Sequence, residues 1–200
     1  MTDPARPSDV HPCAGAVLCG GASRRMGRDK ALLELGGVAL AARVARAMTA
    51  AGADPVVAVG GDADALGRWQ LAVVPDDHPG EGPLGGVLTA LHALREHPIV
   101  AILACDLAEP HPATIRAVVH ALRVDTDADV AVPVHLGRRH FHHAVWRQRA
   151  LPTIEQAFRS GERAPRRVSD ELRVVEVVVA RPETLRDVDD PAAFAAERRR

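Results

Sequence analysis

The sequence predicts an α/β fold of three layers, in which a mostly parallel sheet carries helices on both faces. Two observations predict it. Short apolar segments alternate with helical segments at regular spacing, and the strand segments are almost continuously apolar, as strands buried on both faces are. With 200 residues, of which 47% are hydrophobic, the chain has enough apolar material for one sizeable core.

The first two elements are a strand and a helix. AGAVLCGG, residues 14–21, is an apolar run that ends in paired glycines, as a buried strand does where it enters a loop. In residues 38–52 apolar side chains recur at helical spacing. We expect Arg43 and Arg46 on the outer face of this helix and Gly52 at its end.

The middle of the chain continues the alternation. Residues 55–61 and 70–77 predict a second and a third buried strand. A helix is expected at 82–97, where Pro83 occupies the first turn. Residues 98–106 are the clearest strand of the sequence, because they form an apolar run closed by an aspartate.

The last third completes the pattern. Its expected elements are a helix at 111–123, a strand at 127–134, a helix at 150–162, a strand at 171–180 and a closing helix at 190–200. No internal repeat or long linker is visible, so residues 14–200 are expected to form a single domain. Residues 1–13 are polar and contain proline, which indicates a flexible N-terminal segment.

Composition and charge argue against several classes of protein. The net charge is −1 and 2% of the residues are aromatic, so neither a basic field nor stacking surfaces for nucleic acid are expected. No apolar run has the length of a membrane span or of a signal-peptide core. Cys13, Cys19 and Cys105 show no CxxC spacing, and we expect buried thiols in a reducing cytoplasm.

Ligands bind at the carboxyl ends of strands in parallel sheets. The candidate site is therefore expected at two strand ends, the loop after Cys19 and the carboxylate of Asp106 after Cys105. After the first strand, Gly20 and Gly21 allow backbone N–H groups to approach an anion closely. Four cations follow within seven residues: Arg24, Arg25, Arg28 and Lys30. A di- or triphosphate is the expected ligand, although a glycine turn followed by a solvated charge run has the same spacing.

Lys30 is the single lysine among 25 basic residues. Lysine presents a compact ammonium and arginine a planar fork, so a site that places a point charge between phosphate oxygens favours lysine. The spacing matches neither common phosphate-binding motif, since Walker A requires GxxxxGK[ST] and the dinucleotide motif requires GxGxxG.

The stretch LCGGASRRMGRDK, residues 18–30, resembles the LAGGxSxRMGxDK signature of the nucleotidyltransferases that include molybdenum cofactor guanylyltransferase. Cys19, in place of alanine, is its one departure. Further stretches are similar to motifs of this family in the same order: LLELGG, VVPDDHPGEGPLGGVLTAL and LACDLAEP. The resemblance covers residues 14–110.

The resemblance implies a Rossmann-like nucleotidyltransferase fold and an enzymatic activity. The implied reaction transfers GMP from GTP to the phosphate of molybdenum-loaded molybdopterin, releases pyrophosphate and forms the guanine dinucleotide cofactor. Mg²⁺ is the implied cofactor, and Asp106 matches the metal-binding aspartate of the family. The implied catalytic residues are Lys30, Arg25 and Asp106.

For the nucleotide, the resemblance points to the first strand end and to the acidic motif. Asp76 matches the residue that would accept hydrogen bonds from guanine, with Asp77 as the alternative. Either aspartate could instead be a turn residue before Pro79. The implied nucleotide-binding residues are Leu18, Cys19, Gly20, Gly21, Lys30, Gly60, Asp76 and Asp106.

The acceptor side departs from the family pattern. Family members have NxNTP where this chain has DVDDP, residues 187–191, and extra negative charge is unfavourable beside a pterin phosphate. The arginines of GERAPRR, residues 161–167, could offset that charge or could be solvated. The acceptor-binding candidates are Arg163, Arg167, Asp187 and Asp189, with Arg166 beside them.

Four histidines gather in HLGRRHFHH: His135, His140, His142 and His143. His140 and His142 are expected on one face of a strand, which would permit a transition-metal site. Neither cysteine nor a carboxylate lies close in sequence to complete a ligand set. We expect this segment to line the acceptor side of the cleft or to be polar surface.

Two alternatives stay open at this point. A cytidylyltransferase, or a relative with another phosphorylated acceptor, fits the same motifs. A nucleotide-binding module without turnover would account for DVDDP. The expected partners are GTP and molybdenum-loaded molybdopterin, with transient contacts to cofactor-biosynthesis proteins or apo-molybdoenzymes, and with neither nucleic acid nor membrane.

Overall fold

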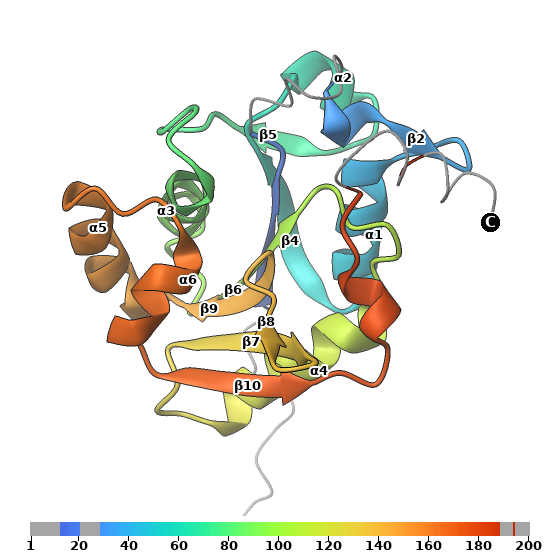
Figure 1. The fold of residues 1–200 in the computed structure, drawn as a ribbon. Helices are drawn as coiled ribbons and strands as arrows, with labels where there is room; N and C mark the ends of the chain where they lie inside the picture. Colours follow the sequence, from blue (N-terminus) through green and yellow to red (C-terminus); the bar gives the residue numbers. More distant parts are fainter. Residues whose placement is uncertain (1–12, 21–28, 189–193, 195–200) are drawn as a thin grey trace, which may run out of the picture.

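A computed structural model describes residues 13–20, 29–188 and 194 of the chain, and its centre is a mixed sheet of eight strands (Figure 1). The strand order is β10-β7-β9-β6-β1-β4-β5, and β8 pairs with β7. The strands are β1 (Cys13–Leu18), β4 (Ala53–Val59), β5 (Ala72–Val74), β6 (Ile99–Ala104), β7 (Val130–His135), β8 (Arg138–Arg139), β9 (His143–Arg147) and β10 (Val174–Val178).

Most of this sheet is parallel, as the apolar strand segments predicted. The strands β5, β4, β1 and β6 pair in parallel, and so do β7 and β10. β9 is antiparallel to both β6 and β7 and joins the two parallel groups. This strand was missed, because the short HAVWR run is flanked by histidines and arginine rather than by turn residues.

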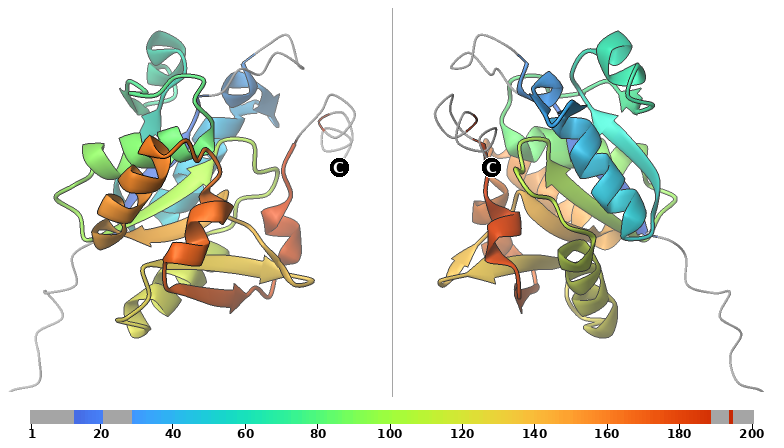
Figure 2. Two further views of the ribbon diagram at one scale, coloured as in Figure 1. Left: turned by 60° about the vertical axis from the view of Figure 1, so that its left-hand side comes forward. Right: turned by 90° about the vertical axis from the view of Figure 1, so that its right-hand side faces the viewer.

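Helices cover both faces of the sheet, which confirms the predicted three-layer class. One face carries α1 (Leu40–Ala50) and α4 (Pro112–Val124), which the right-hand view of Figure 2 shows side by side. The other face carries α3 (Pro83–Ala93), α5 (Leu151–Arg159) and α6 (Pro165–Val168). The shorter elements are η1 (Lys30–Leu32), β2 (Glu34–Leu35), β3 (Val38–Ala39), α2 (Ala63–Gly67), η2 (Gln148–Ala150), η3 (Ser169–Glu171) and η4 (Pro182–Leu185).

Each face of the sheet has its own apolar core. Val17 and Leu103 point toward α1 and α4, where they join Ile115. Their neighbours Ala16 and Ile102 point to the opposite face and pack with α3 and α5. This alternation explains why the central strands are apolar along their whole length, since both faces of each strand are buried.

Helix α1 differs from its prediction at two points. It begins at Leu40, because Val38 and Ala39 pair with Glu34 and Leu35 in a small hairpin. Arg46 is exposed as expected, but Arg43 is half-buried and donates to the carbonyl of Ala108 at 3.2 Å. The guanidinium of Arg43 therefore fastens the loop that follows β6.

The predicted closing helix at 190–200 lies outside the described residues except for Phe194, which is helical. The predicted flexible segment is likewise outside them, except that Cys13 begins β1 and is buried. None of the helices in the described part of the chain is both long and apolar enough to span a membrane.

Candidate active site

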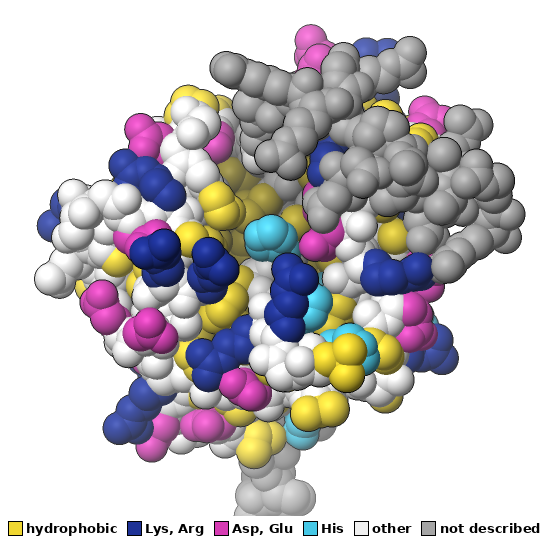
Figure 3. Space-filling model, viewed as in Figure 1, with side chains coloured by type: hydrophobic (Ala, Val, Ile, Leu, Met, Phe, Trp, Pro, Cys, Tyr) yellow, Lys and Arg dark blue, Asp and Glu magenta, His cyan; other side chains and the backbone are white. Residues whose placement is uncertain are grey.

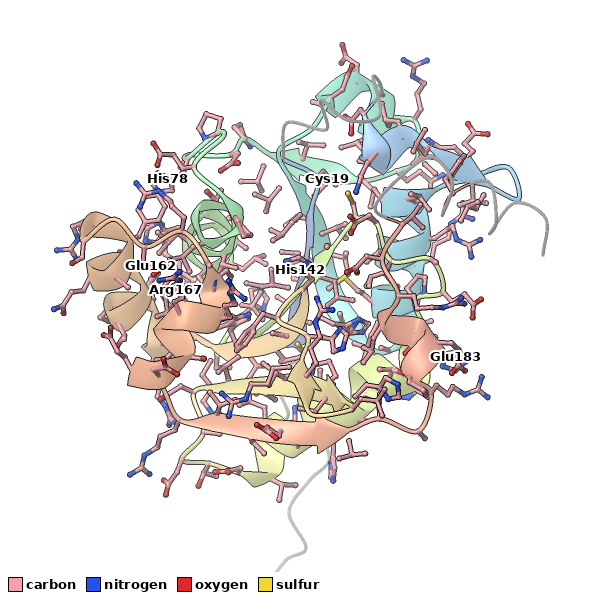
Figure 4. The ribbon with its side chains drawn as sticks, viewed as in Figure 1. Cys19, His78, His142, Glu162, Arg167 and Glu183 are labelled. Carbon is pink, nitrogen blue, oxygen red and sulfur yellow. The ribbon has the colours of Figure 1, made fainter. Side chains whose placement is uncertain are left out.

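The carboxyl ends of β1, β4, β5 and β6 meet at one edge of the sheet. The N–H groups of Cys19 and Gly20 both donate to the carbonyl of Val59, at 2.9 and 3.0 Å. On the other side of β1, the N–H of Cys105 donates to the carbonyl of Leu18 at 3.2 Å. These bonds bring the loops after three strands together, and Figure 4 shows Cys19 at this edge.

Gly20, Gly60 and Asp76 pack against one another with no room to spare. A Cβ on Gly60 would lie 3.0 Å from the Cα of Gly20, and Gly60 has a φ of +70°. A Cβ on Gly20 would lie 2.9 Å from Oδ2 of Asp76. The structure thus gathers the predicted nucleotide-binding residues Leu18, Cys19, Gly20, Gly60 and Asp76, whereas Gly21 lies outside the described residues.

The two competing aspartates have different surroundings. Oδ1 of Asp76 accepts from the Thr89 hydroxyl at 3.1 Å and from the N–H of His78 at 3.0 Å. Asp76 is half-buried and lies against Gly20, while Asp77 is exposed and its N–H donates to Thr89. Asp76 therefore has the role of a turn residue that was foreseen for it, since Oδ1 accepts from the N–H of His78. This role uses one of its two carboxylate oxygens.

Lys30 and Asp106 form an ion pair across 76 residues of sequence. Nζ of Lys30 donates to Oδ2 of Asp106 at 3.1 Å, and the side chains are 20% and 17% exposed. Asp29 caps η1 by accepting from the N–H of Ala31, which places Lys30 in the first turn. Two of the three predicted catalytic residues are therefore in contact, and Arg25 lies outside the described part of the chain.

Oδ1 of Asp106 is buried and has no hydrogen-bond partner among the described residues. A buried carboxylate oxygen left in this way is costly unless a cation or donor completes it. Mg²⁺ takes oxygen ligands and commonly needs only one or two carboxylates beside substrate phosphates. The described residues hold no group of three or more Asp, Glu, His or Cys side chains suited to a metal, so a magnesium site at Asp106 would draw on one or two side chains from this part of the chain.

Asp187 and Val188, the first two residues of DVDDP, run beside the loop of Asp106. The N–H of Val188 donates to the carbonyl of Asp106 at 2.8 Å, and Leu107 and Asp187 form an isolated β-bridge. Asp187 is thereby placed next to the candidate metal site. Asp189 is outside the described residues.

A pocket of about 710 Å³ adjoins this segment. Figure 3 shows basic and histidine side chains on the face that carries α6 and β8. Acidic side chains balance part of this charge, and Arg139 pairs with Glu176 at 2.7 Å. The pocket is lined in part by Arg138, His140, Phe141, His142, Arg166 and Asp187.

The predicted acceptor arginines occupy other places. Nε of Arg163 donates to Glu81 at 2.7 Å, and its guanidinium lies 4.1 Å from the Phe158 ring centroid. Arg167 is 3.8 Å from Glu162, and Figure 4 shows both residues at the α5–α6 connection. Of the three arginines in GERAPRR, Arg166 is the one that lines the pocket.

The predicted strand through the histidines was wrong. β8 ends at Arg139 and β9 begins at His143, so His140 and His142 lie in the connection between them. His140 lines the pocket, and burial and then the charge of Arg138 lower its pKa. His143 is buried in the sheet, where burial lowers its pKa to about 3. Both of its ring nitrogens have no hydrogen-bond partner within the described ranges.

All three cysteines are free and buried, as predicted. Burial raises the pKa of the Cys13 thiol to about 11. Cys19 and Cys105 follow neighbouring strands, and a hydrogen bond with Cys19, together with burial, raises the pKa of Cys105. Cys19 and Cys105 act as small apolar residues in the core beside the site, whereas Cys13 lies at the opposite end of β1.

Sequence reasoning missed Thr89, which contacts both Asp76 and Asp77. One signal could have indicated it. Thr89 is the single hydroxyl in PLGGVLTALHA, a helix whose other residues are nearly all apolar. A polar side chain in a helix that is apolar on every side must find a partner in the core.

The fold and this site define an α/β nucleotidyltransferase as the class of the protein. A family model described as MobA-like NTP transferase domain matches residues 15–177. The chain therefore belongs to the MobA-like NTP transferase family, and the resemblance drawn from residues 18–30 is confirmed.

Relatives and solved structures agree with this assignment. The chain is 39% identical to a probable molybdenum cofactor guanylyltransferase of Opitutus terrae over 156 residues, 77% of this chain and 76% of that protein. It is 31% identical to one of Mycobacterium tuberculosis over 191 residues, 94% of each. The crystal structure of molybdopterin-guanine dinucleotide biosynthesis protein A from Archaeoglobus fulgidus shares the fold, with a TM-score of 0.75 at 23% identity over 93% of this chain and 97% of that one.

Proposed function

We propose that this chain transfers GMP from GTP to the phosphate of molybdenum-loaded molybdopterin, with Mg²⁺, and releases pyrophosphate. The carrying observation is the Lys30–Asp106 pair, in which one buried oxygen of Asp106 has no partner among the described residues. The names of the relatives at 31 and 39% identity support the choice of substrates.

In this proposal the base lies against the first strand end and the phosphates lie toward Lys30. Gly20 and Gly60, beside Leu18 and Cys19, provide a surface without side chains, and Asp76 presents a carboxylate oxygen to the guanine edge. The N–H groups near Gly21, with Arg25 and Lys30, hold the phosphates. Asp106 holds Mg²⁺, which supplies neutralisation of the phosphate charge.

The reaction needs no protein nucleophile. An oxygen of the acceptor phosphate bonds to the α-phosphorus of GTP while the bond from that phosphorus to the oxygen leading to the β-phosphate breaks, so pyrophosphate leaves. Lys30 stabilises the charge that develops on the leaving group. The rest of the catalysis is positioning of two polyanions in line.

The pocket beside Asp187 is the proposed acceptor site. Arg138 and Arg166 supply positive charge there, and Phe141 offers an apolar surface for a pterin ring. Arg163 and Arg167 pair with Glu81 and Glu162 and are not among the residues that line this pocket. Transient contacts with other proteins of cofactor biosynthesis, in the reducing cytoplasm, complete the proposal.

Calorimetry with GTP, CTP and ATP, each with and without Mg²⁺, tests the nucleotide half of the proposal. The expected result is Mg²⁺-dependent binding of GTP in preference to the other two. Preference for CTP would indicate the cytidylyltransferase, and absence of binding of all three would indicate a module without turnover. Titration with a pterin phosphate then tests the acceptor pocket, with Arg166→Ala as the weakened variant.

A further inference from the structure

Thr89 lies in the middle of α3 with its side chain 1% exposed. Its neighbours in the core are apolar, among them Leu88 and Leu91. A hydroxyl at such a position costs free energy unless hydrogen bonds satisfy it. The contacts of this hydroxyl therefore show what the residue is for.

Three polar atoms surround Oγ1 of Thr89, each at 3.1 Å. They are the N–H of Asp77, Oδ1 of Asp76 and the carbonyl of Gly85 one turn earlier. The N–H of Asp77 can only donate, so Oγ1 accepts there. The single hydroxyl proton has two acceptors to choose from, and a carboxylate oxygen is the stronger one.

Within the described part of the chain, the hydrogen bonds to the Asp76 carboxylate all go to one oxygen, Oδ1. Oδ1 accepts from Thr89 and from the N–H of His78. Oδ2 lies on the opposite side, 2.9 Å from the place that a Cβ on Gly20 would occupy. The two bonds to Oδ1 fix the plane of the carboxylate, and that plane aims Oδ2 across Gly20 toward the strand ends.

We infer that Thr89 is a positioning residue for nucleobase selection, because it orients Asp76 so that Oδ2 faces the base edge of a purine with ring N–H and amino donors. This inference rests on the proposed function and assigns a role to a residue outside the nucleotide-contacting set. Thr89 touches no substrate. It acts through the carboxylate that does.

The test compares Thr89→Val, Thr89→Ser and a matched control, Thr114→Val, at another buried threonine. Thr114 is on α4, 4% exposed, and bonds Thr184 at 3.0 Å, on the other face of the sheet. Valine has the shape of threonine without the hydroxyl, and serine restores the hydroxyl. Each variant is assayed for GTP binding, KM, kcat, the ratio of GTP to ATP affinity, and melting temperature.

Thr89→Val is expected to weaken GTP binding and raise KM for GTP about tenfold, the loss of one hydrogen bond to a charged group. The GTP-to-ATP ratio should fall by a similar factor, while kcat at saturating GTP stays within about threefold. Thr89→Ser should recover most of the ratio, and Thr114→Val should keep it at the wild-type value.

Wild-type protein that does not prefer GTP would overturn the proposed function, and the inference with it. Wild-type preference for GTP that persists in Thr89→Val would overturn the inference alone. Equal losses of kcat and affinity for both nucleotides, with the ratio unchanged, would also overturn it, because Thr89 would then be a structural residue.

Discussion

At the scale of single residues, the surroundings of Lys30 explain why this basic residue is a lysine while the other 24 are arginines. Its ammonium contacts Asp106 at 3.1 Å, and the phosphate contacts that we propose would require it to bond in further directions from a small volume. An ammonium offers three donors about a compact charge, whereas a guanidinium offers a planar fork that pairs edge-on with one carboxylate.

Lys30→Ala is expected to lower nucleotidyl transfer about 10²- to 10³-fold, because it removes the charge that stabilises the leaving pyrophosphate. Lys30→Arg keeps the charge and should still fall well below wild type. Steady-state turnover with GTP checks both. Arg95→Ala, at an exposed cation that pairs with Glu96, is the control and should match wild type; full activity of Lys30→Ala would refute the phosphate role.

Gly60→Ala is expected to destabilise the protein by about 2 to 4 kcal/mol, since the new Cβ adds contact with the backbone of Gly20 to the strain of a positive φ. GTP affinity should fall as well. Gly52→Ala shares the positive φ, +95°, but its Cβ meets open space, so it should cost only about 1 to 2 kcal/mol and leave GTP binding unchanged. Urea unfolding and calorimetry measure both effects, and equal results for the two variants would contradict a tight contact.

At the scale of elements, β9 carries the one strand reversal within the main path of the sheet. It pairs with β6 along its whole length and with Val130 and Ala131 at the start of β7. His143 begins it, buried and with no hydrogen-bond partner for its ring among the described residues. Burial, with smaller contributions from His140 and His142, lowers the pKa of this histidine from 6.5 to about 3.

This shift makes stability depend on pH in a defined direction. Above pH 6.5 His143 is neutral in both the folded and the unfolded state and adds no pH dependence to the free energy of unfolding. As the pH falls toward 3 the unfolded state binds the proton first, so the free energy of unfolding drops by about 1.4 kcal/mol per pH unit. Urea unfolding from pH 7 to 5 should show this slope in wild type and a smaller one in His143→Leu. His120→Gln, at an exposed histidine of α4, should keep the wild-type slope, and an unchanged slope in His143→Leu would refute the assignment.

At the scale of the whole molecule, the sequence predicted what depends on local pattern. Apolar runs predicted β1, β4 and β6. Glycines and charged residues at the carboxyl ends of these strands predicted that the site lies at this edge of the sheet. β9 was missed because its burial depends on which strands flank it, which no local pattern encodes. Thr89 was missed for a similar reason, because its hydrogen-bond partners Asp77 and Asp76 lie in a loop 12 and 13 residues away in sequence.

In the proposed function GTP and Mg²⁺ bind the folded state alone, so their binding should stabilise the whole domain. At a GTP concentration of 100 Kd the gain is about 2.7 kcal/mol, which raises the melting temperature by about 5 to 10 °C. Asp106→Asn should lose the Mg²⁺-dependent part of this rise while it melts normally without ligand. Thermal scans with and without Mg²⁺ measure the difference, and a variant that keeps the full rise would place the metal elsewhere.

The backbone bridge between Leu107 and Asp187 also sets an order of events during synthesis. β1, β4 and β6 emerge from the ribosome first and can pair within the first half of the chain. The strand partner of the Asp106 loop is made about 80 residues later. A nascent chain can therefore assemble β1, β4 and β6 well before Asp187 is available to form the bridge with Leu107.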